Sequence, residues 1–273
     1  MSLDRRAFIQ ALAALAVPGI ATAAPSGQLV LATYPGTGKA DIGAAEFMAG
    51  VLPLRADLER ASGMSLAISL LRPIRRFNAA AQLALKAPDL AYGPATSVAA
   101  YMAAGYRPLA RNGEPASGVI ASKLPLRAIR SVAFPDPDSW LALVGEYTVE
   151  ALTGRGLEYQ YARSQNAAIE AMRYGLADAV ALRPEALAAS RLTESGYRII
   201  ARMPDTPDYT VLIHPRLDVF TRAALKAALL GLPAATLAAL DRVYHVRVGR
   251  FVRAEAGEYD LLRRIVAAAK SFG

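Results

Sequence analysis

The stretch "PDLAYGPATS", residues 88–97, joins a short apolar strand to a helix through a Gly-Pro pair. Its "LAY" run has the composition of a buried strand, and proline is favoured in the first turn of a helix. Thr96 and Ser97 then place hydroxyls beside the backbone N–H groups that a first turn leaves unpaired. The stretch therefore predicts a strand, a tight turn and a helix start whose donors could form part of a site.

The same alternation of strand and helix extends outward along the chain in both directions. The predicted strands are 28–34, 65–71, 89–92, 117–122, 130–135, 157–162, 178–182, 197–203 and 209–214. The predicted helices are 40–62, 75–86, 94–104, 138–153, 165–174 and the tail from residue 215. Strands separated by helices in this way indicate an α/β protein with mostly parallel sheets that carry helices on both faces.

Two segments have the composition of linkers between lobes. Residues 112–117 ("NGEPAS") and 202–208 ("RMPDTPD") are rich in Gly, Pro, Ser and Asp. If the chain crosses between lobes at both, residues 116–200 form an inserted lobe. Residues 24–115 and 201–273 then build the other lobe together. Such an arrangement encloses a cleft, which is a common place for ligands.

The N-terminus predicts an export signal over residues 1–23, with a charged start, an apolar run and a small-x-small cleavage site. "DRRAFIQ" is similar to a twin-arginine signal, with the general secretory route as the alternative. The apolar run is too short to favour a permanent anchor. The chain has no cysteine, which excludes a lipoprotein anchor and disulfides. The predicted location is the periplasm.

The positive charge of the chain could attract nucleic acid, anionic lipid or a small anion, but its distribution argues against nucleic acid. Loss of the signal removes two arginines and one aspartate and lowers the formal net charge from +8 to +7. The basic residues are scattered, without the blocks interleaved with aromatics that a nucleic-acid groove shows. Such a charge also suits a small anion, although a basic solvated surface explains it equally well.

The sequence also lacks the common catalytic and metal-binding patterns. "YPGTGKAD" (34–41) is not a phosphate-binding P-loop, because that motif needs Gly at position 33 and Ser or Thr at position 40. It remains a Gly-rich turn that is either a loop alone or a ligand contact, and in the second case Tyr34 is the best candidate. The only histidines, His214 and His245, have no carboxylate pattern beside them, so no metal site is predicted. No nucleophile elbow occurs, and no catalytic residue or cofactor is predicted.

Three predicted helix starts, residues 93–97, 136–140 and 163–168, carry Ser, Thr, Asp or Asn after a strand. Each is explained by N-capping alone. Together they could direct several N–H donors at an anion. One helix terminus contributes about 0.3–1 kcal/mol, whereas micromolar affinity needs about 8 kcal/mol. Side-chain donors and closure of the cleft must therefore supply most of the binding energy.

The order of these segments resembles the phosphate/phosphonate-type periplasmic substrate-binding proteins of ABC importers. The resemblance runs through "LATYPGTG", "LALKAPDLAYGPATSVAAY", "GVIASKLPLRAIRSVAFPDPDSW", "AAIEAMRYGLADAVAL" and "RMPDTPDYTVLIHPRL", and ends with "GRFVRAEAGEYDLLRRIV". It implies the two-lobed class II binding-protein fold, with a mostly parallel sheet flanked by helices in each lobe. The ligand-binding residues that it implies are Tyr34, Tyr92, Thr96, Ser139 and Asn166.

The resemblance gives these residues expected roles. The two tyrosines supply phenol donors or a stacking face, Thr96 and Ser139 supply donors at helix starts, and Asn166 caps the third helix. Asp178 lies near the return crossover and is as much a structural as a ligand-facing candidate. The turn "DPDSW" departs from the family pattern, because Asp138 and Trp140 would repel or obstruct a small doubly charged oxyanion.

The positive charge of Arg75 and Arg76 could offset that departure, although plain exposure to solvent is the favoured explanation of both arginines. The expected function is capture of a small anionic ligand, an oxyanion or a phosphonate-like molecule, by a monomer that carries out no chemistry. An importer permease is the expected partner. A sensory adaptor for a membrane sensor kinase is the alternative, and a transferase on the same scaffold is a third reading.

Overall fold

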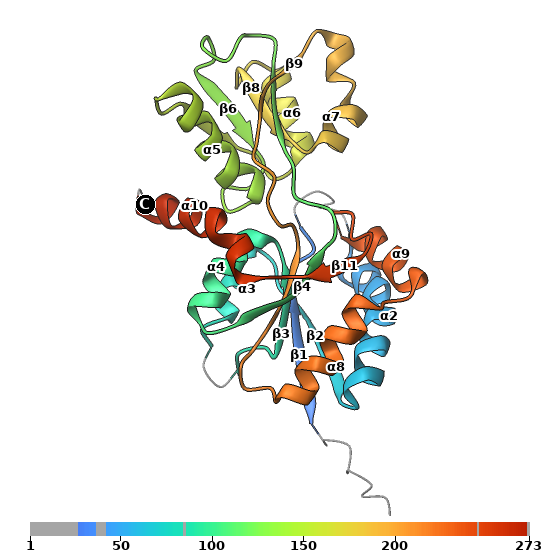
Figure 1. The fold of residues 1–273 in the computed structure, drawn as a ribbon. Helices are drawn as coiled ribbons and strands as arrows, with labels where there is room; N and C mark the ends of the chain where they lie inside the picture. Colours follow the sequence, from blue (N-terminus) through green and yellow to red (C-terminus); the bar gives the residue numbers. More distant parts are fainter. Residues whose placement is uncertain (1–26, 37–41, 84–85, 245, 272–273) are drawn as a thin grey trace, which may run out of the picture.

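A computed structural model describes residues 27–36, 42–83, 86–244 and 246–271 of this chain. The predicted export signal, residues 1–23, lies outside the described residues, as does most of the Gly-rich turn after Tyr34. The described chain forms two sheets with helices on their faces (Figure 1).

The first sheet has six strands in the order β11-β4-β10-β3-β1-β2. Strands β2, β1 and β3 are parallel, whereas β10 and β11 run antiparallel to their neighbours. The bounds are β1 (Gln28–Thr33), β2 (Ser65–Leu70), β3 (Leu90–Gly93), β4 (Arg107–Asn112), β10 (Thr210–Ile213) and β11 (Phe251–Arg253).

The second sheet has five strands in the order β7-β6-β8-β5-β9. Strands β7, β6 and β8 are parallel, and β5 runs antiparallel to β8 and β9. The bounds are β5 (Val119–Ser122), β6 (Ser131–Phe134), β7 (Glu158–Tyr161), β8 (Ala179–Leu182) and β9 (Arg198–Arg202). Both sheets thus have a parallel core, as the sequence predicts, to which antiparallel strands are added.

The chain passes from the first sheet to the second after β4 and returns before β10. The two connecting segments run side by side between the lobes (Figure 1) and form an isolated β-bridge at Ala116 and Thr206. Each of these two residues donates its backbone N–H to the carbonyl of the other, at 2.8 and 3.2 Å. Strand β9 continues to Arg202, beyond the predicted end of the inserted lobe at residue 200. The lobe boundaries themselves stay a prediction.

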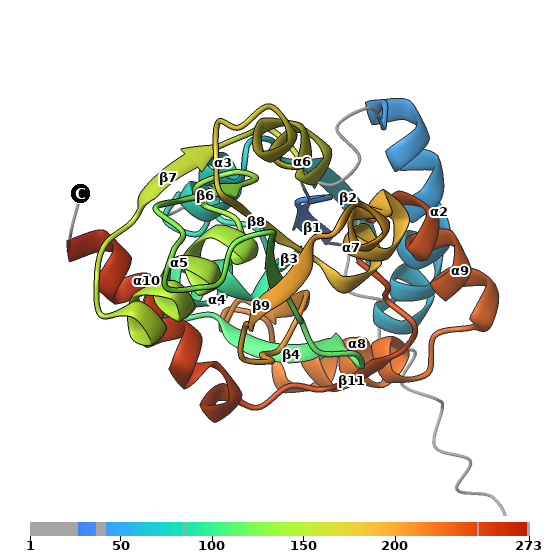
Figure 2. The same cartoon turned by 90° about the horizontal axis from the view of Figure 1, so that it is seen from above.

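Helices cover both faces of the sheets (Figures 1 and 2). In the first lobe α2 (Ala44–Ser62), α8 (Val219–Leu230) and α9 (Ala234–Val243) cover one face, and α3 (Ile74–Ala80) and α4 (Ala95–Ala103) the other. The second lobe has α5 (Trp140–Thr153), α6 (Gln165–Arg173) and α7 (Pro184–Ser190). The last helix, α10 (Asp260–Ser271), packs against both α4 and α5 and so connects the two lobes.

The alternation of side chains along β3 decides which residues point toward each layer. Leu90 and Tyr92 pack into the core under α2, α8 and α9, whereas Ala91 packs into the core on the opposite face. Successive strand residues face opposite sides of a sheet, so Tyr92 faces the layer of α2, α8 and α9. Tyr34, just beyond β1, shares the opposite face with Ala32. Tyr34 and Tyr92 therefore lie on opposite faces of the first sheet.

Some elements differ from the sequence-based expectation. Strands β4 and β11 and helix α7 are not among the predicted elements. The β4 segment "RPLARN" carries a proline and two arginines that hide its apolar pattern, and β11 has only three residues. The predicted helix 75–86 is wrong in its length, because α3 ends at Ala80. No local breaker stops it, since the next five residues are good helix formers.

Among the described residues no single helix has the length and apolar composition to cross a membrane. Helices α8 and α9 reach that length and composition only as a pair, and they meet at a bend of 84°.

The buried hydroxyl of Tyr244 predicts a loss of stability in alkali. Burial raises the pKa of Tyr244, and the hydrogen bond with Thr33 opposes that rise only in part. Tyr244 therefore stays neutral in the fold while the unfolded chain ionises near pH 10. The contribution of the neutral Tyr244 to the free energy of unfolding is complete below pH 10 and falls above it by about 1.4 kcal/mol per pH unit. Melting temperatures of the wild type should fall more steeply above pH 10 than those of Tyr244→Phe. Equal slopes would contradict the prediction.

Candidate functional site between the lobes

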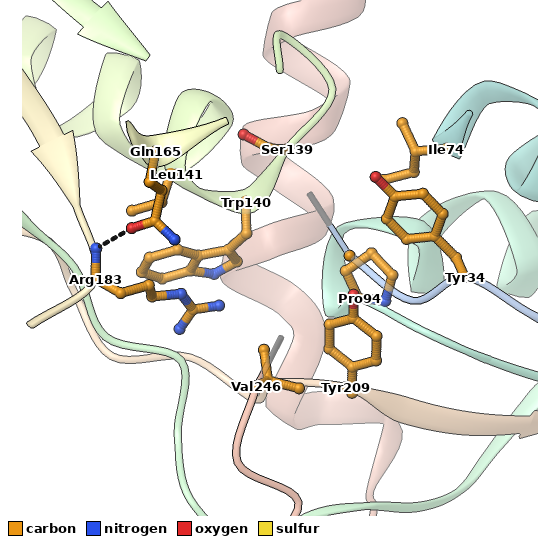
Figure 3. Close-up of a pocket in the computed structure, with 11 residues that line it drawn as sticks. Tyr34, Ile74, Pro94, Ser139, Trp140, Leu141, Gln165, Arg183, Tyr209 and Val246 are labelled. Atoms are coloured by element: carbon orange, nitrogen blue, oxygen red, sulfur yellow. Dashed lines mark hydrogen bonds between the residues drawn. The ribbon is translucent and has the colours of Figure 1, made fainter. Parts of the chain in front are cut away.

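A cavity of about 480 Å³, including its mouth, lies between the two lobes (Figure 3). Both lobes and the return connection contribute to its walls. The described lining residues are Tyr34, Gly36, Ile74, Pro94, Ser139, Trp140, Leu141, Gln165, Arg183, Tyr209 and Val246.

The topology explains why residues so far apart in sequence meet here. Tyr34 follows β1, Pro94 follows β3 and Arg183 follows β8. Each therefore lies just beyond the carboxyl end of a strand in the parallel core of its sheet. Ligands of open α/β sheets bind in the crevice at these carboxyl ends. The two parallel cores thus direct their loops at one cavity.

Arg183 is the charged side chain among the described residues that line this cavity. Its guanidinium lies 4.6 Å from the ring centroid of Trp140, and its Nη2 donates to Oδ1 of Asp208 at 3.3 Å. Its Nη1 donates to the carbonyl of Ser117 at 3.3 Å. These contacts use two of the five N–H donors of a guanidinium. The other three have no hydrogen-bond partner among the described residues.

Asp208 and Gln165 hold Arg183 in this position. Burial raises the pKa of the Asp208 carboxyl, and the charge and hydrogen bond of Arg183 oppose that rise. The Arg183 backbone N–H donates to Oε1 of Gln165 at 2.8 Å (Figure 3). The arginine is thus anchored at its backbone and at its guanidinium, which limits its freedom in the cavity.

Trp140 opens α5 and forms the wall on which Arg183 lies. Its Nε1 donates to Oγ1 of Thr206 at 2.8 Å, which ties the second lobe to the return connection. Ser139 is the N-cap of this helix, and its Oγ accepts from the backbone N–H of Ala142 at 3.2 Å. Only 4% of Trp140 is exposed. The indole therefore lies inside the wall and does not block the cavity.

Tyr34 faces Trp140 from the first lobe (Figure 3). Burial raises the pKa of its hydroxyl well above the usual value, the carboxylate of Asp136 adds to the rise, and Arg72 opposes it. Tyr34 is therefore a neutral phenol that can donate. The Arg72 Nη1 donates to the carbonyl of Ile42 at 3.2 Å. Its buried Nε and Nη2 have no hydrogen-bond partner among the described residues.

The predicted ligand-binding residues fall into two groups. Tyr34 and Ser139 line the cavity, whereas Tyr92, Thr96 and Asn166 are not among the described lining residues. Tyr92 is fully buried and donates its hydroxyl to Oδ1 of Asn112 at 2.8 Å. Strand alternation explains this placement, because Tyr92 points to the face of the sheet that α2 covers.

Thr96 and Asn166 both lie at helix starts, and only Asn166 departs from its expected role. Thr96 is the second residue of α4, and its buried Oγ1 and the neighbouring Oγ of Ser97 have no partner among the described residues. Asn166 is exposed and does not cap α6. Ser164 is the N-cap, since its Oγ accepts from the backbone N–H of Ala167 at 3.2 Å. The predicted capping role of Asn166 is therefore wrong.

The other charged candidates have partners elsewhere. Asp178 Oδ2 accepts from the backbone N–H groups of Arg130 and Ser131, at 2.7 and 3.2 Å, which is a structural role at the start of β6. Asp138 pairs with Arg75 of the first lobe at 3.6 Å. Asp138 thus does not face the cavity as an unpaired charge, and Arg75 is largely exposed.

The residues that the sequence did not single out are Ile74, Leu141, Gln165, Arg183, Tyr209 and Val246. One signal was available for Arg183, because an arginine directly after the buried run "AVAL" stands at the carboxyl end of a strand. Nothing in the local pattern marks Tyr209 or Val246. Among the residues that the structure describes, no three His, Asp or Glu side chains are grouped so that they could hold a metal ion.

Solved structures with this architecture are distant in sequence. PhnD1 from Prochlorococcus marinus, in complex with methylphosphonate, aligns at 16% identity with a TM-score of 0.67 over 89% of this chain and 98% of its own. A binding protein of an ABC phosphonate transporter from Pseudomonas aeruginosa aligns at 14% identity with a TM-score of 0.64, over 89% of this chain and 87% of its own. The periplasmic aliphatic sulphonate binding protein SsuA from Escherichia coli aligns at 15% identity with a TM-score of 0.56, over 90% of this chain and 87% of its own. These likenesses show a two-lobed binding-protein fold.

No curated protein is significantly similar to this chain in sequence. A family model, described as the periplasmic substrate-binding protein of phosphonate ABC transporters, matches residues 41–259. The matched region includes both sheets except β1, and all but two of the described cavity residues. Those two, Tyr34 and Gly36, precede the match by a few residues, and the cavity they line is continuous with the matched part. This chain therefore belongs to the family of periplasmic substrate-binding proteins of phosphonate-type ABC transporters.

Proposed function

We propose that this chain captures a small anionic ligand between its lobes and delivers it to the membrane permease of an ABC importer. The observation that carries the proposal is the guanidinium of Arg183, which lies at the cavity with donors to spare. A fixed guanidinium recognises carboxylate, sulfonate and phosphonate oxygens through planar, paired hydrogen bonds. The role is one of binding and release, and no chemical step is part of it.

Two further groups support an anionic ligand. Thr96 and Ser97 at the start of α4 have unpartnered buried hydroxyls, next to Pro94 at the cavity wall. A helix start with free donors favours negative charge. Arg72 acts on Tyr34 by its charge and has two unpartnered nitrogens. A rearrangement that brings either group to a ligand would satisfy buried donors that are otherwise costly to leave unpaired.

The structural neighbours support the same class of ligand. One of them was solved with methylphosphonate and another is a sulphonate binding protein. Both compounds are organic anions with a tetrahedral oxyanion group. The family description and the phosphonate-transporter neighbour favour transport over the sensory role. Export by the signal over residues 1–23 and action as a monomer complete the proposal.

Ligand-induced stabilisation tests this function. We expect a member of a panel of phosphonates, sulfonates and carboxylates to raise the melting temperature of the signal-free protein. At about 100 times the Kd the gain is about 2.7 kcal/mol, or roughly 5–10 °C for a chain of this size. Sodium chloride at matched ionic strength is the control. No shift with any panel member at millimolar concentration would count against anion capture.

A further inference from the structure

The walls of the cavity present mainly carbon to a ligand. Tyr34, Trp140 and Tyr209 contribute rings, and the other apolar walls come from Ile74, Pro94, Leu141 and Val246. Figure 3 shows Tyr34 and Tyr209 across the cavity from Trp140. An apolar ligand body gains free energy against such walls in proportion to the area it buries. A bare inorganic oxyanion would lose its hydration there and find few polar partners in return.

The described walls of the cavity can balance about one negative charge. Arg183 is the one ionised side chain among the described lining residues, and it already contacts Asp208 at 3.3 Å. Arg72 is not one of those lining residues, although its charge acts at the hydroxyl of Tyr34. A doubly charged ligand would therefore leave its second charge desolvated and without a cation among the described lining residues, which is strongly unfavourable.

Carboxylates surround the cavity on the side beyond Arg183. A second hollow, of about 1210 Å³, shares Gln165, Arg183 and Val246 with the first. Its acidic residues are Glu114, Glu185, Asp205 and Asp208, against the cations Arg183 and Arg247. An anion is repelled from that hollow and stays on the aromatic side of Arg183. The charges of Asp136 and Asp138 also act at the hydroxyl of Tyr34, where they oppose further negative charge.

We propose, on the basis of the function proposed above, that this cleft selects organic anions with a single negative charge and a ring-sized apolar body. It would disfavour phosphate and small, doubly charged phosphonates. The carbon walls select a ligand with an apolar body, and the single guanidinium, shared with Asp208, selects one negative charge. The acidic hollow confines the anionic group of the ligand to one end of the cavity.

Calorimetric titration of the signal-free protein with a matched series of probes tests this. Benzenesulfonate and methanesulfonate carry one charge and differ in the ring. Phenylphosphonate and methylphosphonate differ in the same way and are largely doubly charged at about pH 8, as a phosphate monoester is. Phosphate completes the series. Each buried methylene adds about fourfold in affinity, so benzenesulfonate should bind at least tenfold more tightly than methanesulfonate and more tightly than phenylphosphonate.

The outcomes separate this inference from the function on which it rests. Tighter binding of phosphate or methylphosphonate than of benzenesulfonate would overturn the inference and leave anion capture intact. Absence of binding by all five probes would contradict anion capture and the inference together. The predicted order of affinities would support both.

Replacement of one ring in the wall adds a test within the site. Tyr34→Ala should lower the affinity for benzenesulfonate at least tenfold and change that for methanesulfonate much less, because only the first has a body to contact the ring. Tyr34→Phe is the matched control and should keep the preference. An equal loss for both sulfonates in Tyr34→Ala would overturn the inference, and melting curves verify that each variant is folded.

Discussion

Tyr92→Ala is expected to lower the free energy of unfolding by about 3–5 kcal/mol, the range for a large buried aromatic side chain. Tyr92 is fully buried in the first lobe, where its ring lies 4.8 Å from that of Tyr244 and 5.5 Å from that of Tyr209. The ring of Phe251 is at 5.6 Å. The substitution removes these ring contacts and leaves a cavity under α2. Urea denaturation measures the change.

Tyr92→Phe is the matched control, since it keeps the ring and removes only the hydroxyl. It leaves the buried Oδ1 of Asn112 without its 2.8 Å donor, at a cost of about 1–3 kcal/mol. Ligand affinity in the folded Phe variant should equal that of the wild type, because Tyr92 is not among the described residues of the cavity. A stable Ala variant, or a Phe variant with weakened binding, would contradict the structural role assigned to Tyr92.

The contrast between Tyr34 and Tyr92 shows how far the sequence leads. Both follow an apolar strand run, and the family resemblance places both near a ligand. The alternation of side chains in "DLAYG" does not show which face of the sheet Tyr92 occupies, because both faces of β3 are apolar. A strand that is buried on both sides has no polar face to reveal its orientation. The fold was predictable, and the side that Tyr92 faces was not.

The second lobe shows a different limit. Ser139 was predictable as a helix start from local capping chemistry, and it caps α5. The sequence also singled out Trp140, but as an obstruction to the ligand. Its actual place in the wall depends on Thr206, which is 66 positions away. Contacts between such distant residues follow from the packing of the lobes and have no local pattern.

Arg183→Met should have the other large effect, a loss of about 3–5 kcal/mol in the free energy of unfolding. Asp208 is only 6% exposed, and Arg183 is its ion-pair partner at 3.3 Å. Removal of one member of a buried pair leaves an uncompensated charge, and that cost exceeds the net worth of the intact pair. The variant also loses the cation–π contact with Trp140. Denaturant unfolding at pH 7 measures the loss.

A double variant separates stability from binding. Arg183→Met with Asp208→Asn removes both charges and should recover most of the lost stability, because neutral replacements of a buried pair are often tolerated. It should not recover ligand affinity, since the guanidinium that we propose for the anion is still absent. We expect affinity at least 100-fold below wild type in the double variant, which corresponds to about 2.7 kcal/mol. Wild-type affinity in the folded double variant would exclude Arg183 as the anion partner.

The pH dependence of the single variant distinguishes charge from packing. Burial already raises the pKa of Asp208, and the guanidinium is the largest influence that opposes the rise. Without Arg183 the carboxyl pKa rises further, so the folded state binds a proton more readily than the unfolded chain. The loss in Arg183→Met is therefore greatest above the raised pKa of Asp208 and should shrink as the pH falls toward about 4, the unfolded value. A loss that is constant between pH 7 and about pH 4 would show that packing against Trp140, and not the buried carboxylate, accounts for the effect.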